Sequence, residues 1–123
     1  MKTLPTKLKA QGGALLIEAM IAILIFSFGV LAIVGMQATS LRQTTDAKYR
    51  LDASFMANQI LGEMWVKKSA LSTFVVNRAA LPGLPNGFKT VAVAGDVVTV
   101  TIFWHLPGET VDHVYTTITQ IKS

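Results

Sequence analysis

The chain begins with a long apolar stretch and continues with apolar residues at helical spacing. Residues 19–36 carry no charged side chain, and together with residues 14–17 they are long enough to cross a membrane as an α-helix. Beyond Gln37, apolar residues recur at intervals of three and four, as in an amphipathic helix. This stripe comprises Tyr49, Ala53, Met56, Ala57, Ile60, Leu61 and Met64. Because no proline interrupts residues 6–81, the pattern predicts one helix from about Ala14 to about Ser69–Val76.

The last third of the chain has the alternating pattern of β-strands. Residues 78–88, RAALPGLPNGF, contain two prolines and two glycines and are predicted to form a loop. Gly95-Asp96 separates two β-rich runs and predicts a hairpin turn. Residues 105–109 turn the chain again, and residues 110–121 supply a third strand. Val98, Val100, Ile102 and Trp104 are predicted to share one face of the sheet.

The predicted fold class is therefore α+β. A long N-terminal helix, whose first half spans a membrane, packs on a small three-stranded antiparallel sheet, which needs the helix to cover one face. The chain divides into a basic leader (1–13), a transmembrane helix (14–36), an amphipathic continuation of that helix (37–77), and a loop with an antiparallel sheet that forms a head (78–123).

Charge and composition narrow the possible functions. The formal net charge is +4, but the first thirteen residues contribute Lys2, Lys7 and Lys9 and no acid. Lysines in front of an apolar segment favour retention of that end in the cytoplasm, so the basic balance indicates membrane topology and no nucleic-acid partner is expected. The chain has no cysteine, which excludes disulfides and thiol catalysis.

Glu18 lies at the head of the apolar run. Thirteen Leu, Ile, Phe and Val residues between Leu15 and Val34 favour insertion by about 4–8 kcal/mol in total, whereas one acidic residue costs about 3 kcal/mol at the centre of a helix and less near its end. Insertion is therefore favoured despite the charge. We expect an unpaired carboxylate at this position to be kept for a function, and a carboxylate that reaches back to the membrane surface is the structural alternative.

A cleaved secretory signal peptide is disfavoured. The apolar run is long for such a signal, and no A-x-A pattern with a polar junction follows it. The small pair Gly12-Gly13 precedes the run, so cleavage there would remove the lysines and keep the apolar helix.

These features resemble the class III signal of type IV pilins and of the pseudopilins of type II secretion. The resemblance covers roughly residues 12–36: a basic leader, Gly13, a glutamate at the fifth position after it and about twenty apolar residues. It implies that a prepilin peptidase cuts between Gly13 and Ala14, that Ala14 becomes N-methylated, and that Glu18 is the assembly carboxylate. Ala14 departs from the family pattern, in which phenylalanine is commonest.

The C-terminal half resembles PilV-type minor pilins, through Leu81-Pro82-Gly83 and the strand VTVTIFW. The resemblance implies a minor pilin that takes part in priming or forming the tip of a type IV pilus, with roles in twitching motility and adhesion. Its expected partners are the prepilin peptidase, other minor pilins, the major pilin and the inner-membrane assembly platform. The expected location is the inner membrane, as a single-pass protein with a periplasmic head, and then the pilus at the cell surface.

No enzymatic site is expected in the head. His105 and His113, with Glu109 and Asp112 nearby, could in principle hold a metal ion, but no third ligand has tight spacing, so no metal and no cofactor are predicted. Phosphate loops and nucleophile elbows are absent from the sequence. Three alternatives stay open: a minor pseudopilin of a type II secretion system, an unprocessed single-pass protein with a ligand-binding head, and a secreted enzyme cleaved near residue 38.

Overall fold

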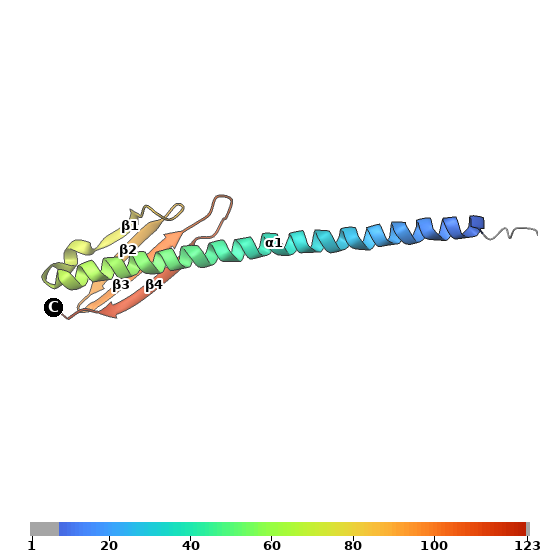
Figure 1. Ribbon diagram of the computed structural model, residues 1–123. Helices are drawn as coiled ribbons and strands as arrows, with labels where there is room; N and C mark the ends of the chain where they lie inside the picture. Colours follow the sequence, from blue (N-terminus) through green and yellow to red (C-terminus); the bar gives the residue numbers. More distant parts are fainter. Residues whose placement is uncertain (1–7, 123) are drawn as a thin grey trace, which may run out of the picture. The chain divides into compact units, whose positions relative to one another are not determined.

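A computed structural model describes residues 8–122, with side chains from residue 12. The predicted leader residues Lys2 and Lys7 lie outside these described residues. The elements are α1 (Leu8–Val66), the 3₁₀ segment η1 (Lys68–Phe74), and the strands β1 (Val76–Ala80), β2 (Phe88–Ala94), β3 (Val97–Trp104) and β4 (His113–Gln120) (Figure 1). The chain divides into two compact units, one ending at Gln43 and the other beginning at Thr44.

The first unit contains the apolar part of α1. Every side chain from Gly12 to Gln43 is exposed. The hydroxyls of Ser27 and Thr39 bond back to the carbonyl oxygens of Ile23 and Gly35, at 2.7 Å and 3.2 Å. Such bonds satisfy a polar side chain within the helix itself, as an apolar environment requires.

In the second unit, four antiparallel strands follow one another in the order β1-β2-β3-β4. Gly95 and Asp96 form the two-residue turn between β2 and β3, with Ala94 opposite Val97, so the predicted hairpin is confirmed. Gly95 has φ of +60°, a conformation that glycine adopts without strain. The strand predicted over residues 110–121 is confirmed over His113–Gln120, which form β4, whereas residues 110–112 belong to the preceding loop.

The core of this unit lies between α1 and the sheet. Ala53, Ala57 and Met64 of α1 are fully buried, and the partly buried Tyr49 and Met56 pack against the same cluster. From the sheet, Val98, Val100, Ile102 and Trp104 are buried at every second position of β3. Both predicted patterns, the helical stripe and the alternation of β3, are therefore confirmed, and the helix covers one face of the sheet.

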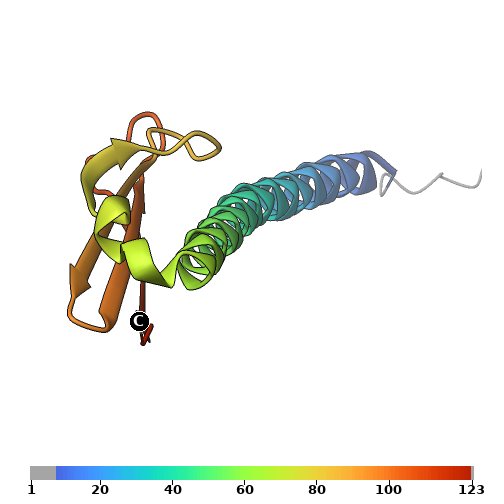
Figure 2. The ribbon, with the colours of Figure 1, turned by 90° about the vertical axis from the view of Figure 1, so that its left-hand side faces the viewer.

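The end of α1 and the number of strands differ from the prediction. The α-helix ends at Val66, and the chain continues as η1 (Figure 2). Within η1, Ala70 has a non-helical conformation. This change of direction places Leu71 in the core and Phe74 against it. Burial of these two side chains explains why the helix stops although neither glycine nor proline is present.

The additional strand is β1, which occupies residues predicted as the end of the helix and the start of the loop. It pairs with β2 through Val76 opposite Val91 and Ala80 opposite Phe88, with a bulge between Val76 and Ala79. Within the bulge, Arg78 has φ of +47° and donates its backbone N–H to Thr90 Oγ1 at 3.2 Å. Its guanidinium lies 4.9 Å from the centroid of the Phe88 ring. Contacts with β2 thus hold a segment of low β-propensity in the sheet.

The loop between β3 and β4 is held by Glu109. One carboxylate oxygen lies 2.8 Å from His113 Nε2 and accepts the backbone N–H of Leu106 at 3.3 Å. The hydrogen bond with His113 is the largest cause that lowers the pKa of Glu109 below 4.5, although partial desolvation opposes it. The ring of His113 also stacks on Trp104, with 5.5 Å between centroids, so this exposed loop is tied to the edge of the core.

Two isoleucines on neighbouring strands test the assignment of the core. Ile102 is fully buried, whereas Ile118 is 65% exposed on the opposite face. Replacement Ile102→Ala is expected to lower the free energy of unfolding by about 2–5 kcal/mol, and Ile118→Ala by less than about 0.5 kcal/mol. Thermal unfolding of the full chain in detergent, followed by near-UV circular dichroism, measures both. Equal losses for the two variants would contradict this packing.

The lowered pKa of Glu109 predicts a dependence of stability on pH. Because the pKa is lower in the folded state, the ionised carboxylate stabilises the fold above the unfolded value of 4.5, and this contribution disappears as the pH falls through the folded pKa. The difference in Tm between the wild type and Glu109→Gln is therefore expected to be largest above pH 4.5 and to decrease as the pH falls through the folded pKa. Glu63→Gln, at an exposed position on α1, serves as the control. A difference that stays constant over this range would contradict the prediction.

Candidate functional site

The predicted cleavage position lies on the described part of α1. Gly12, Gly13 and Ala14 are helical and exposed. A Cβ atom added to either glycine would meet no other atom within 4 Å, so packing within the chain does not require glycine here. Glycine inside a helix costs about 1 kcal/mol relative to alanine. The pair therefore has no structural benefit within the described residues, and an external requirement explains it better.

Glu18 lies one helical turn beyond Ala14 and on the same face of α1. Four residues of α-helix correspond to a rise of about 6 Å. The Glu18 side chain is exposed, and it forms no hydrogen bond or ion pair with any residue that the structure describes. No other acidic residue precedes Asp46 in the sequence. The helix thus presents one carboxylate without a partner at the head of an apolar surface.

The apolar surface that follows Glu18 is extensive. No charged residue lies between Glu18 and Arg42, and large side chains such as Phe26, Phe28 and Met36 are 64–72% exposed. Among the described residues, one helix near the N-terminus is long and apolar enough to cross a membrane, and its apolar stretch has no buried side chain. This finding agrees with the predicted single-pass anchor, because such a surface is stable only in lipid or against other apolar helices.

Small residues form a shallow depression on the same helix. Ala32, Gly35 and Thr39 contribute to its lining, together with Met36, Ser40 and Gln43. A Cβ atom at Gly35 would again have nothing within 4 Å. Small side chains allow another helix to approach closely in an apolar medium. The sequence analysis did not identify this depression, although the helical spacing of Ala32, Gly35 and Thr39 would have indicated it.

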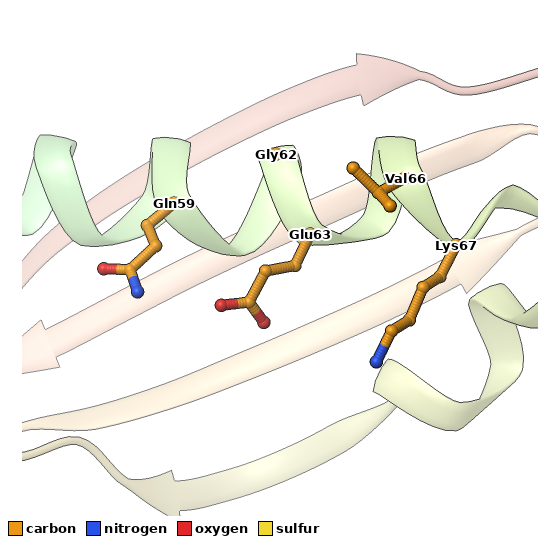
Figure 3. A pocket seen from close by; sticks show the side chains of 5 residues that line it. All are labelled: Gln59, Gly62, Glu63, Val66 and Lys67. Atoms are coloured by element: carbon orange, nitrogen blue, oxygen red, sulfur yellow. The ribbon is translucent and has the colours of Figure 1, made fainter.

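A second depression lies on the exposed side of α1 in the second unit (Figure 3). It is lined by Gln59, Gly62, Glu63, Val66 and Lys67, all from the end of one helix and the residue after it. A single helix surface does not enclose a small molecule as a typical ligand pocket does.

The side of α1 that faces away from the sheet also carries large apolar side chains. Leu51, Phe55 and Val66 are 58–84% exposed, and their spacing places them opposite the buried side of the helix. This side is thus suited to contact another protein surface.

The two histidines of the head form separate pairs with carboxylates. His113 bonds Glu109, as described above, and His105 Nδ1 lies 3.7 Å from Asp112 Oδ1. Within residues 8–122, no three His, Asp or Glu side chains are arranged so that they could hold a metal ion. The described residues of this loop therefore offer no chelating set.

Within residues 8–122, the candidate site thus comprises an exposed apolar helix and a carboxylate without a partner one turn beyond Gly13-Ala14, and the second unit carries a four-stranded sheet. Comparison of the chain with protein-family models, with curated proteins and with solved structures gives no match.

Proposed function

We propose that the chain is a minor pilin of the PilV type that takes part in type IV pilus assembly. The observation that carries the proposal is Glu18, which lacks a partner within the described residues at the head of an exposed apolar helix, one turn beyond Gly13-Ala14. The class III resemblance of residues 12–36 supports the same function. In this function the protein is a structural component and not an enzyme.

Cleavage between Gly13 and Ala14 would change the charges near Glu18. It removes Lys2, Lys7 and Lys9 and creates a cationic amine at Ala14, within reach of a glutamate on the same helical face. In a filament, the amine of an incoming subunit meets the Glu18 carboxylate of its neighbour. Because a lone charge in an apolar interior is costly and a paired one is tolerated, the pair selects the correct register of subunits more than it adds affinity.

The rest of the chain fits the same role. Before assembly the apolar helix anchors the chain in the inner membrane, with the positive end in the cytoplasm and the head in the periplasm. During assembly this helix leaves the lipid for the apolar helices of neighbouring subunits. The small residues around Gly35 are available for that packing. The head is then exposed at the pilus surface, where it contacts neighbouring subunits.

The first test is the mass of the mature chain, purified from the membranes of cells with an active prepilin peptidase. The expected N-terminus is Ala14 carrying one methyl group. Gly13→Val is expected to retain the leader, because a branched side chain replaces glycine at the cleaved bond, whereas Gly12→Ala is expected to be processed normally. Wild-type chain that keeps residues 1–13 in such cells would contradict the proposal.

The second test concerns Glu18. Glu18→Gln keeps the size of the side chain and removes its charge, so processing and membrane insertion are expected to persist. Incorporation into sheared pili is expected to fall about tenfold or more, because the incoming amine is left without its counter-ion. Immunoblots of sheared pili and of membranes from the same cells give the ratio. Glu18→Asp, which keeps the charge, is the matched control, and incorporation of Glu18→Gln at the wild-type level would contradict the role of the pair.

A further inference from the structure

The two edges of the sheet differ in how they are protected against another strand. Strand β1 is short, contains a bulge and carries Arg78 at φ of +47°. Bulges and charged residues are features that natural proteins use to prevent pairing at a sheet edge. Strand β4 has none of these features. Its eight residues pair with β3 in unbroken register, and its sequence HVYTTITQ contains neither proline, glycine, lysine, arginine nor acid.

The backbone groups of β4 that point away from β3 can be identified. The N–H of Ile121 donates to the carbonyl oxygen of Asp96 at 2.7 Å, so the odd-numbered residues direct their backbone groups toward the β3 side. Because backbone direction alternates along an antiparallel strand, the even-numbered residues direct theirs outward. These residues are Val114, Thr116, Ile118 and Gln120, and their side chains are all exposed. In residues 8–122, no strand pairs with this side of β4.

A second copy of the chain does not fit this edge. Symmetric pairing of β4 with β4 of another copy requires a two-fold axis normal to the sheet, which reverses every direction in its plane. The buried side chains from Ala53 to Met64 show that this part of α1, in the second unit, lies along the sheet (Figure 1). The two Thr44 residues, which lead to the apolar segments, would then lie at opposite ends of the pair. Two anchors in one membrane require the same end, and the bulged β1 is a poor donor for a head-to-tail arrangement.

We propose that the free edge of β4 accepts an extended strand from a different subunit anchored in the same membrane. The incoming strand is uncharged. It places β-branched or aromatic side chains opposite Val114, Thr116 and Ile118 of β4, with which such residues form favourable cross-strand pairs. The identity of the partner as a filament subunit rests on the proposed function. The open edge itself rests on the register and composition of β4.

Site-specific photocrosslinking of the full chain, in cells that assemble the filament, tests this proposal. The probe is p-benzoylphenylalanine in place of Thr116, and the control carries it in place of Thr101. The two threonines lie opposite each other on the same face, with 3.5 Å between their hydroxyl oxygens, but Thr101 is one strand further from the edge. A strand added to β4 lies about 5 Å from Thr116 and about 10 Å from Thr101. We expect an adduct at Thr116 alone, joined to a β-strand of another subunit with an N-terminal apolar helix.

The other outcomes overturn the proposal. Equal labelling at Thr116 and Thr101 indicates a partner packed on the face of the sheet. An adduct of twice the mass of the chain indicates a second copy, and a missing adduct at Thr116 indicates that the edge stays free. The mass of the chain in the same sample distinguishes failure of the edge contact from failure of the proposed function. A chain that retains its leader contradicts the pilin assignment. A mature chain with equal labelling at the two threonines contradicts only the edge contact.

A pair of variants tests whether backbone hydrogen bonds carry the contact. Thr116→Pro removes one outward N–H and none of the bonds to β3, and Thr116→Val keeps the N–H in a similar shape. With the photoprobe at Ile118, adduct yield is expected to fall about tenfold for Thr116→Pro and to stay near the wild-type level for Thr116→Val. Thermal unfolding confirms that each variant is folded. If Thr116→Pro is unfolded, the comparison of Thr116 with Thr101 decides alone. Equal yields from the two folded variants would overturn a strand contact.

Discussion

Helix α1 has to satisfy two different surroundings, and the rest of the structure depends on this constraint. Between Ala53 and Met64, one side of the helix is buried against the sheet and supplies part of its core. Between Gly12 and Gln43, every side chain is exposed and no part of the described chain covers them. One segment therefore stabilises the head from within, whereas the other needs lipid or other helices to remove its apolar surface from water.

The parts of the fold that local pattern determines were predictable from the sequence. The helical stripe around Ala57, the alternation of β3 and the turn at Gly95 each follow from side chains close together in the chain, and all three are confirmed. The end of α1 and strand β1 were not predictable in the same way. Leu71 turns the chain because the core receives it, and Arg78 is held by Thr90 and Phe88, which are distant in sequence. Long-range contacts such as these override weak local propensity.

The candidate site likewise has a part that was predictable from the sequence and a part that required the structure. Glycine, apolar length and the position of Glu18 are properties of the sequence, so the site residues could be named without a structure. The structure adds that neither Gly12 nor Gly13 has a packing role and that Glu18 is without a partner among residues 8–122. The open edge of β4 lies beyond sequence reasoning, because an edge exists only once the strand order is known. The residues of β1 and β4 can be compared as protected and unprotected edges only once the strand order places both strands at the borders of the sheet.

A charge pair and a strand edge would control different aspects of assembly. An amine and a carboxylate in an apolar interior tolerate few arrangements, because displacement leaves two charges unpaired, and they therefore fix the position of one helix along another. Apolar helix surfaces alone would slide, since their packing is nearly equivalent at several registers. A strand edge offers backbone groups at fixed intervals, and the side chains of Val114 and Ile118 restrict which strand fits. The helix would thus set where a subunit joins, and the head would select which subunit lies beside it.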